Sequence, residues 1–204
     1  MGQVAFRGPS FDRQAVHRIH IIGGAGSGKT TLACQVAARL EIPVYFLDEI
    51  YYGSDIYFKN AGEAHRSLDT LLADVSRIAA QSAWVTEGAY LGWTEELLCR
   101  ADMIIWLDIP WHVAAWRIIV RQVYKGLINP THHPIRHKLK RFILFYLKQR
   151  KYYLSSILVE RNTFKDDSAK NRITTAQYLA SYTNKLVRCC SSSEVETFLA
   201  SIFP

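Results

Sequence analysis

The sequence is poor in cysteine and has no long apolar run. Among its 204 residues there are four cysteines and no CxxC pair, so neither a disulfide framework nor a thiolate metal site is expected. Apolar runs such as 142–147 are far too short to cross a bilayer, and the first residues do not form a signal segment. We therefore expect a cytoplasmic protein with reduced thiols and no membrane partner.

One segment nearly lacks acidic residues. Residues 111–161 contain eleven Lys or Arg and a single acid, Glu160, whereas the rest of the chain has fourteen basic and seventeen acidic residues. The formal charge of +7 therefore divides into about +10 for this segment and about −3 for the remainder. A positive field of this kind would attract phosphate, whether on a nucleotide, a nucleic acid or a membrane surface. The alternative is that these basic side chains form a solvated helical face and bind no phosphate.

Apolar residues make up 49% of the chain and recur in strand-like and helix-like runs that alternate. The pattern predicts strands at 16–22, 42–47, 83–86, 103–107 and 185–190, and helices at 31–40, 63–81, 110–126, 136–160, 174–182 and 191–203. Such alternation indicates an α/β fold with a parallel sheet covered on both faces. Ligands of such sheets bind at the carboxyl ends of the strands.

The most specific motif is the loop Gly23–Thr30, which meets the pattern G-x-x-x-x-G-K-[ST] in full. Its glycines let backbone N–H groups surround phosphates, and the helix that follows adds its positive end. Lys29 can reach the β- and γ-phosphates of ATP, and the hydroxyl of Thr30 can ligate Mg²⁺. The residues expected to hold the nucleotide are Gly23, Gly24, Ala25, Gly26, Ser27, Gly28, Lys29, Thr30 and Thr31.

Acidic residues follow three of the predicted strands and should face one crevice. Glu87 could hold Mg²⁺-bound water, while Asp48 or Glu49 could orient or deprotonate an acceptor hydroxyl. Asp108 precedes a helix that starts at a proline, so it could cap that helix as well as take part in catalysis. For the other acids, helix capping or simple solvation is the alternative.

Two arginines and a group of histidines lie in the basic segment. Arg117 and Arg121 are four residues apart on one helix face, where they could stabilise a transferring phosphoryl group. A salt-bridged or solvated face is the alternative. His132, His133 and His137 lack other ligand-type residues around them, so no metal is expected there. The aromatic residues of the segment are expected to pack rather than to stack on bases.

Three stretches of the chain resemble the adenylate-kinase-like P-loop kinases. They are HIIGGAGSGKTTLACQVAARLEIPVYFLDEIYY, WVTEGAY and MIIWLDIPWHVAAWRIIVR, and within that family they are most similar to the branch of DNA topology modulation proteins. The resemblance spans roughly residues 17–160. It implies a three-layer P-loop NTPase fold for 1–204, with five parallel strands in the order 2-3-1-4-5. It also implies a helical lid insertion at about 122–160.

The resemblance further implies roles for individual residues. Glu87 with Gly88 matches the acid–glycine pair that supports Mg²⁺, although Asp is more usual there. Arg117 and Arg121 match the paired arginines at the base of the lid, and Arg66 lies where such kinases bind the acceptor. The loop 190–193 would lie near the adenine. The chain lacks the cysteines of zinc-containing lids and an LDGFPR-like stretch, so neither a zinc lid nor AMP as acceptor is implied.

These observations favour an Mg²⁺-ATP-dependent kinase for a small molecule, possible acceptors being nucleosides and nucleotides. Asp48 would act as base for a hydroxyl acceptor, whereas Arg66 would matter more for a phosphate acceptor. Two other classes stay open: a nucleic-acid-associated ATP-binding protein that uses residues 111–161, and a nucleotide-binding regulator without turnover. Binding to a membrane surface by the helix 136–160 is the least favoured, because its charged and apolar residues do not separate cleanly.

Overall fold

The sheet consists of five parallel strands in the spatial order β2-β3-β1-β4-β5. The computed structural model describes residues 16–53, 66–128, 135–157 and 171–202. The strands are β1 (Arg18–Gly23), β2 (Val44–Phe46), β3 (Trp84–Gly88), β4 (Met103–Leu107) and β5 (Leu186–Cys189). The predicted α/β class and the predicted strand order are both confirmed.

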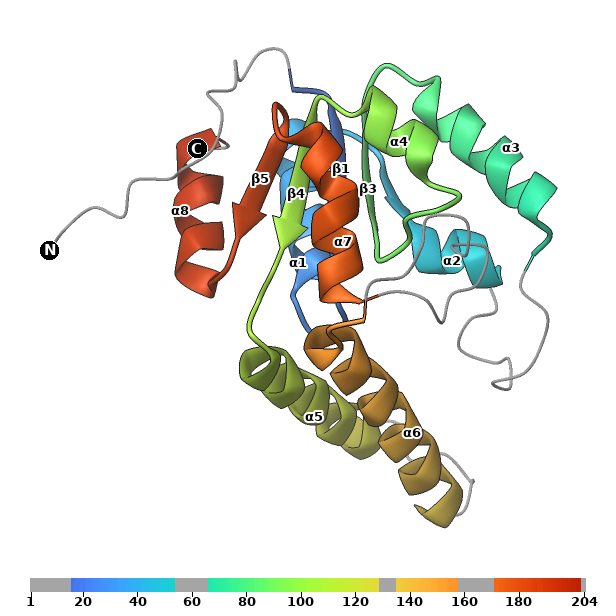
Figure 1. Cartoon of the computed structure of the whole chain (residues 1–204), viewed down its shortest axis with the longest axis vertical. Coiled ribbons are helices and arrows are strands. Elements are labelled where there is room, and N and C mark those ends of the chain that lie inside the picture. Colours follow the sequence, from blue (N-terminus) through green and yellow to red (C-terminus); the bar gives the residue numbers. More distant parts are fainter. Residues whose placement is uncertain (1–15, 54–65, 129–134, 158–170, 203–204) are drawn as a thin grey trace, which may run out of the picture.

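Helices cover both faces of the sheet and make the three layers seen in Figure 1. One face packs against α1 (Lys29–Leu40) and α8 (Ser192–Ile202). The other packs against α2 (Leu47–Tyr52), α3 (Leu68–Ala79), α4 (Glu95–Arg100) and α7 (Arg172–Leu179), which a short 3₁₀ turn, Ala180–Tyr182, extends. Because the central strands are buried on both sides, they are mainly apolar, with His20, Thr86 and Glu87 as buried polar exceptions.

Alternate residues of β1 point to opposite layers. Ile19 and Ile21 belong to the cluster under α1 and α8, whereas Ile22 belongs to the cluster under α3 and α4. All three are essentially inaccessible to solvent. This two-sided burial fixes the end of β1, and with it the loop that follows, against two packed layers.

Local sequence signals explain where several helices begin. The Ser67 hydroxyl accepts from the amide of Thr70 at the start of α3, and the Asn171 side chain accepts from the amide of Thr174 at the start of α7. Ser191 caps α8 by accepting from the amide of Glu194.

Two long helices, α5 (Trp111–Ile128) and α6 (Ile135–Leu154), extend together beyond the carboxyl edge of the sheet (Figure 1). We call them the α5–α6 hairpin. Near the sheet, Trp111 and Ala114 of α5 pack against Tyr152 and Tyr153 of α6. Farther out, large apolar side chains stay accessible, and Trp116 is 66% exposed. In the parts of the chain that the structure describes, no helix is long and apolar enough to cross a membrane.

The structure corrects several predicted boundaries. The strand expected to end at residue 47 ends at Phe46, and α2 begins at once, so that Asp48 and Glu49 lie in the first turn of a helix. The short helix α4 was not predicted. The helix expected at 136–160 ends at Leu154, and its last expected residues lie outside the described ranges.

The helix expected at 63–81 is described only from Leu68 to Ala79, because residues 63–65 lie outside the described part. Its apolar face is narrow. Leu71, Val75 and Ile78 are buried, whereas Leu68 and Leu72 are exposed.

A buried histidine of β1 leads to a pH prediction. The imidazole of His20 is fully buried and bonds through Nδ1 to the Thr86 hydroxyl at 2.8 Å, and burial lowers its pKa to about 4. The unfolded chain takes up this proton below pH 6.5 but the native protein does so only near pH 4, so stability is lost as the pH falls through this window. Between pH 7 and pH 5 we expect a loss of about 2 kcal/mol from this residue.

Urea unfolding at pH 7, 6 and 5 measures this loss. His20→Gln should show a flatter pH dependence than the native chain, whereas His112→Gln, which changes an exposed histidine, should not. Equal pH dependence in all three proteins would contradict the assignment.

Candidate functional site

The loop between β1 and α1 has the backbone geometry of a phosphate cradle. The amide of Ser27 donates to the carbonyl of Gly24 at 3.2 Å, which closes a tight turn. Gly26 and Gly28 have φ angles of +78° and +98°, values that favour glycine. Gly28 is the residue before α1, and Lys29 is the first residue of that helix. The positive end of α1 thus faces the loop.

Gly26 is also required by close packing. A Cβ atom there would lie 2.4 Å from the carbonyl oxygen of Ala114 in α5. The loop is therefore in backbone contact with the α5–α6 hairpin, which the sequence pattern alone did not indicate.

Glu87 lies beside the loop because β3 pairs with β1, with Glu87 opposite Ile21. Its Oε1 accepts from the Thr30 hydroxyl at 3.0 Å, and its Oε2 lies 3.7 Å from the Lys29 ammonium. The carboxylate is 5% exposed. Burial raises the pKa of Glu87, and the nearby Asp48 carboxylate raises it further, while Lys29 and Thr30 oppose the shift. The structure thus brings together Lys29, Thr30 and Glu87 as predicted.

These residues fit a magnesium ion. A carboxylate and a hydroxyl are hard oxygen donors of the kind that Mg²⁺ prefers, with phosphate oxygens and water completing its shell. Within the described part of the chain, Glu87 Oε2 is buried without a hydrogen-bond partner, so it is available to a metal-bound water. No group of three His, Cys, Asp or Glu side chains occurs among the described residues, and the side chains of His132, His133 and His137 lie outside them.

Asp48 lies on the same side of the sheet as Glu87, although on a helix rather than at the end of a strand. Its carboxylate acts on two tyrosines as well: with burial, it raises the pKa of Tyr90 and of Tyr52. Tyr90 is buried among Tyr51 and Trp93, at ring distances of 5.1 Å and 5.0 Å. Asp48 therefore lies beside a group of aromatic side chains from α2 and from the segment that follows β3. Glu49, the alternative predicted base, is exposed.

Arg66 is bonded to the helices on either side of it. Its Nη1 donates to the carbonyl of Ile50 at 3.2 Å and lies 2.6 Å from Asp74 Oδ2. The residue therefore connects α2, which carries Asp48, to α3. Binding of an acceptor by Arg66 stays a prediction.

Arg117 and Arg121 both line a cavity of about 1000 Å³ next to the loop. Arg117 donates through Nη1 to the carbonyls of Ser27 at 2.9 Å and Gly26 at 3.4 Å, and through Nη2 to the Ser192 hydroxyl at 2.8 Å. Arg121 is exposed. The cavity is bounded by Gly26, Ser27, Gly28, Lys29, Thr30 and Thr31 of the loop region, by α1 and α8, and by these two arginines. Its volume is in the range of small-molecule sites.

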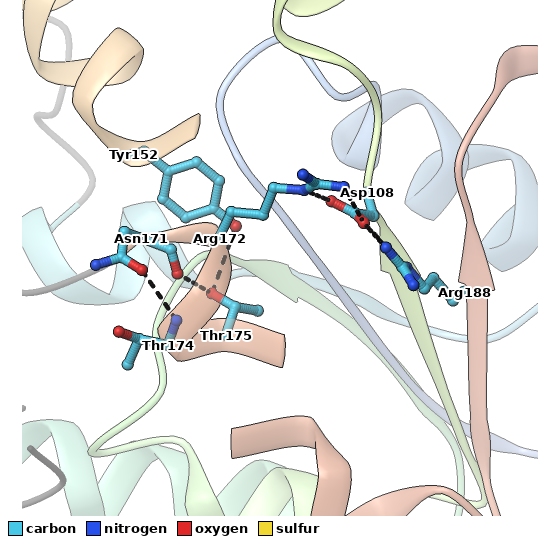
Figure 2. A network of polar contacts seen from close by, with 7 residues as sticks. All are labelled: Asp108, Tyr152, Asn171, Arg172, Thr174, Thr175 and Arg188. Atoms are coloured by element: carbon cyan, nitrogen blue, oxygen red, sulfur yellow. Dashed lines mark hydrogen bonds and ion pairs between the residues drawn. The ribbon is translucent and has the colours of Figure 1, made fainter. Parts of the chain in front are cut away.

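Asp108 lies in an ion-pair network instead of capping α5, and a part in catalysis stays a prediction. Its carboxylate, 1% exposed, accepts from Arg172 of α7 and from Arg188 of β5, as Figure 2 shows. The first-turn amides of α5 at Val113 and Ala114 instead donate to the carbonyl of Pro110. Asp108 is thus the buried anion of an ion-pair network. The hydrogen bond that Arg172 donates to Asp108 raises the pKa of Arg172.

The network of Figure 2 continues to the end of α6. The Tyr152 hydroxyl lies 3.5 Å from the Thr175 hydroxyl, which donates to the carbonyl of Asn171. Arg188 also stacks over Trp106, with 4.8 Å between the guanidinium carbon and the ring centre. Sequence analysis missed Arg172 and Arg188, because nothing local marks them as partners of a residue 64 and 80 positions away.

The strand order and the loop together define the P-loop NTPase fold. Comparison with known proteins adds sequence and structural neighbours. No family model matches the chain. A stretch of 105 residues, 51% of the chain, is 30% identical to the uncharacterized protein YqaC of Bacillus subtilis (strain 168). The match covers 56% of that relative, a little over half its length.

Solved structures with a related arrangement include three described as kinases. A sugar kinase from Janibacter sp. HTCC2649 has a TM-score of 0.46 and 15% identity, over 91% of this chain and 93% of that one. A gluconokinase from Sinorhizobium meliloti 1021 has a TM-score of 0.47 and 14% identity, over 93% of this chain and 90% of that one. A shikimate kinase from Aquifex aeolicus has a TM-score of 0.38 and 22% identity, over 81% of this chain and 95% of that one. None reaches a TM-score of 0.5, so the fold assignment rests on the strand order and the loop.

Proposed function

We propose that this chain is an Mg²⁺-ATP-dependent phosphotransferase that acts on a small-molecule acceptor. The observation that carries the proposal is the contact set of Glu87, whose buried carboxylate bonds Thr30 and lies 3.7 Å from Lys29 at the mouth of the loop. A buried carboxylate with an unsatisfied oxygen is costly in the free protein, and a metal-bound nucleotide would offset that cost.

In the proposed site the loop amides and Lys29 hold the β- and γ-phosphates of ATP, and Thr30 and Glu87 hold Mg²⁺. The metal, when bound, would neutralise charge on the phosphate oxygens. Arg121, and Arg117 if it leaves its loop carbonyls, would stabilise the charge on the transferring group. The α5–α6 hairpin would be the lid of a single domain.

The proposed acceptor is an alcohol bound between α2 and β3. The acceptor oxygen attacks the γ-phosphorus, the bond from that phosphorus to the β-bridging oxygen breaks, and ADP leaves. Asp48 accepts the proton that the hydroxyl loses. The position of Asp48 near Glu87 supports this role, because the base must lie close to the γ-phosphate.

The test is transfer of radiolabelled γ-phosphate from Mg²⁺-ATP to a panel of sugars, small hydroxy acids, nucleosides and nucleotides. A labelled product with one acceptor class is the expected result. Asp48→Asn should abolish most transfer to an alcohol but should leave ATP affinity unchanged, whereas transfer to a phosphate acceptor should survive it. ATP binding without any product would instead favour a nucleotide-binding regulator.

A second candidate function is nucleic-acid-associated ATP binding. It is favoured by the α5–α6 hairpin, in which exposed aromatic side chains, such as Trp116 and Tyr124, alternate with Arg and Lys. Binding of single-stranded DNA that weakens steeply with salt, together with no acceptor phosphorylation, would support this candidate over the first.

A further inference from the structure

Three successive carbonyl groups of the phosphate loop are held by side chains of the α5–α6 hairpin. The Tyr153 hydroxyl of α6 donates to the carbonyl of Ala25 at 2.9 Å. Arg117 of α5 donates to the carbonyls of Gly26 and Ser27. Both helices of the hairpin therefore bond to the backbone of the loop, in addition to packing against it.

The direction of these carbonyls determines the direction of the amides. In a trans peptide the C=O and the N–H point to opposite sides, and none of the described peptide bonds is cis. When Tyr153 holds the carbonyl of Ala25, the amide of Gly26 must therefore point away from Tyr153. Arg117 orients the amide of Gly28 in the same way, through the carbonyl of Ser27.

Tyr153 holds the loop from a position that does not line the cavity. Gly26, Ser27 and Gly28 line the cavity, whereas neither Tyr152 nor Tyr153 is among the described residues that do so. An inward-pointing amide of Gly26 is the kind of group with which a loop of this type binds phosphate.

Tyr153 is well placed to keep this contact. Its ring packs 5.3 Å from Trp111 and 5.0 Å from Tyr152, and the residue is 7% exposed. A Cβ atom on Gly24 would lie 2.7 Å from the Tyr153 ring and 2.6 Å from the Tyr152 ring, so the loop backbone lies directly on the two rings. Burial raises the pKa of Tyr153, so its hydroxyl remains a donor at any physiological pH.

We propose that Tyr153 is a positioning residue that acts from outside the cavity and holds the phosphate loop in its anion-binding shape, so that the packing of α6 against the loop regulates nucleotide affinity. The inference rests on the proposed nucleotide binding. It concerns the phosphate part of the ligand, because Tyr153 acts through the amides and touches no ligand itself. By linkage, nucleotide binding stabilises the packed position of the hairpin to the same degree.

Tyr153→Phe tests the proposal, because it removes the donor and keeps the ring against Gly24. Tyr146→Phe is the matched control, since Tyr146 lies on the same helix and contacts Trp111 and Phe142 rather than the loop. The affinities of the full chain for Mg²⁺-ATP and for inorganic tripolyphosphate are measured by calorimetry, together with the unfolding transition without ligand.

The expected result is a loss of about five- to tenfold in affinity for both ligands in Tyr153→Phe, as for a buried hydrogen bond left unmade. Tyr153→Phe should also lower the unfolding temperature by about 2 to 4 °C, because the bond is present without ligand, whereas Tyr146→Phe should change neither the affinities nor the unfolding temperature. Unchanged affinity in Tyr153→Phe, or a loss seen with ATP but not with tripolyphosphate, would overturn the positioning role and leave the proposed function standing. A native chain that binds neither ligand would overturn the proposed function and this inference together.

Discussion

Replacing Lys29 by alanine should reduce phosphoryl transfer from Mg²⁺-ATP by about 100- to 1000-fold, the usual effect of removing one donor aimed at developing charge. The ammonium is 13% exposed and lies 3.7 Å from Glu87, so it acts at short range in a poorly solvated place. Nucleotide affinity should fall as well, because the ground-state β- and γ-phosphates lose the same partner.

The measurement compares transfer rates and ATP affinity of Lys29→Ala with those of Lys148→Ala, which removes an exposed lysine of α6. Lys148→Ala should behave as the native chain. Circular dichroism of both variants checks that the fold survives. Undiminished transfer by a folded Lys29→Ala protein would rule out the proposed donor site.

Glu87→Gln should weaken Mg²⁺ binding without lowering the stability of the ligand-free protein. We expect the Mg²⁺ concentration needed for half-maximal nucleotide binding to rise about 10- to 100-fold, the range found when groups that orient a metal shell are replaced. The free energy of unfolding without ligand should stay the same or increase at neutral pH. The reason is that the native carboxylate is buried with an unsatisfied oxygen, and a neutral amide of the same shape avoids most of that cost.

The pH dependence of unfolding provides an independent check on Glu87. Its pKa is raised in the native protein, so the unfolded chain ionises first, from the ordinary value of 4.5 upward. The contribution of Glu87 to native stability therefore falls as the pH rises from there through the raised pKa, and its full cost is present above that pKa. His20 acts in the opposite direction over the same range, so the two proteins are compared with each other. Urea unfolding at pH 5 and pH 8 should show that Glu87→Gln gains stability relative to the native chain as the pH rises. Equal slopes, or a metal requirement unchanged in the variant, would contradict the assignment.

The fold and the phosphate loop could be predicted because their signals are local. Three of the five residues from Arg18 to Ile22 are buried isoleucines, and Gly26 and Gly28 stand where the loop requires positive φ angles. Helix α2 was missed for the opposite reason. The stretch around Leu47 is apolar and aromatic on both sides of the strand end. After only three strand residues, the change from the two-residue period of a strand to the period of a helix cannot be seen in the sequence.

The contacts made by the hairpin could not be predicted, since they join residues far apart in the chain. Tyr153 reads as one aromatic among many, and only the folded chain shows that its hydroxyl meets the carbonyl of Ala25, 128 positions away. The same holds for Asp108, whose two arginines come from later elements. Arg117 was predicted from its spacing with Arg121, but the spacing did not indicate that it would bond to the loop backbone.

The strand order has a consequence for how the protein acquires its site. The central strand β1 is made early in synthesis, yet its two neighbours come much later: Ile21 pairs with Glu87 on one side and with Ile105 on the other. Such long-range parallel pairing requires closure of large chain loops and is slow to form. The nascent chain therefore carries its phosphate-binding motif well before that motif can work. Nucleotide binding should appear only after β4 has joined the sheet, so the ligand would stabilise finished molecules and not folding intermediates.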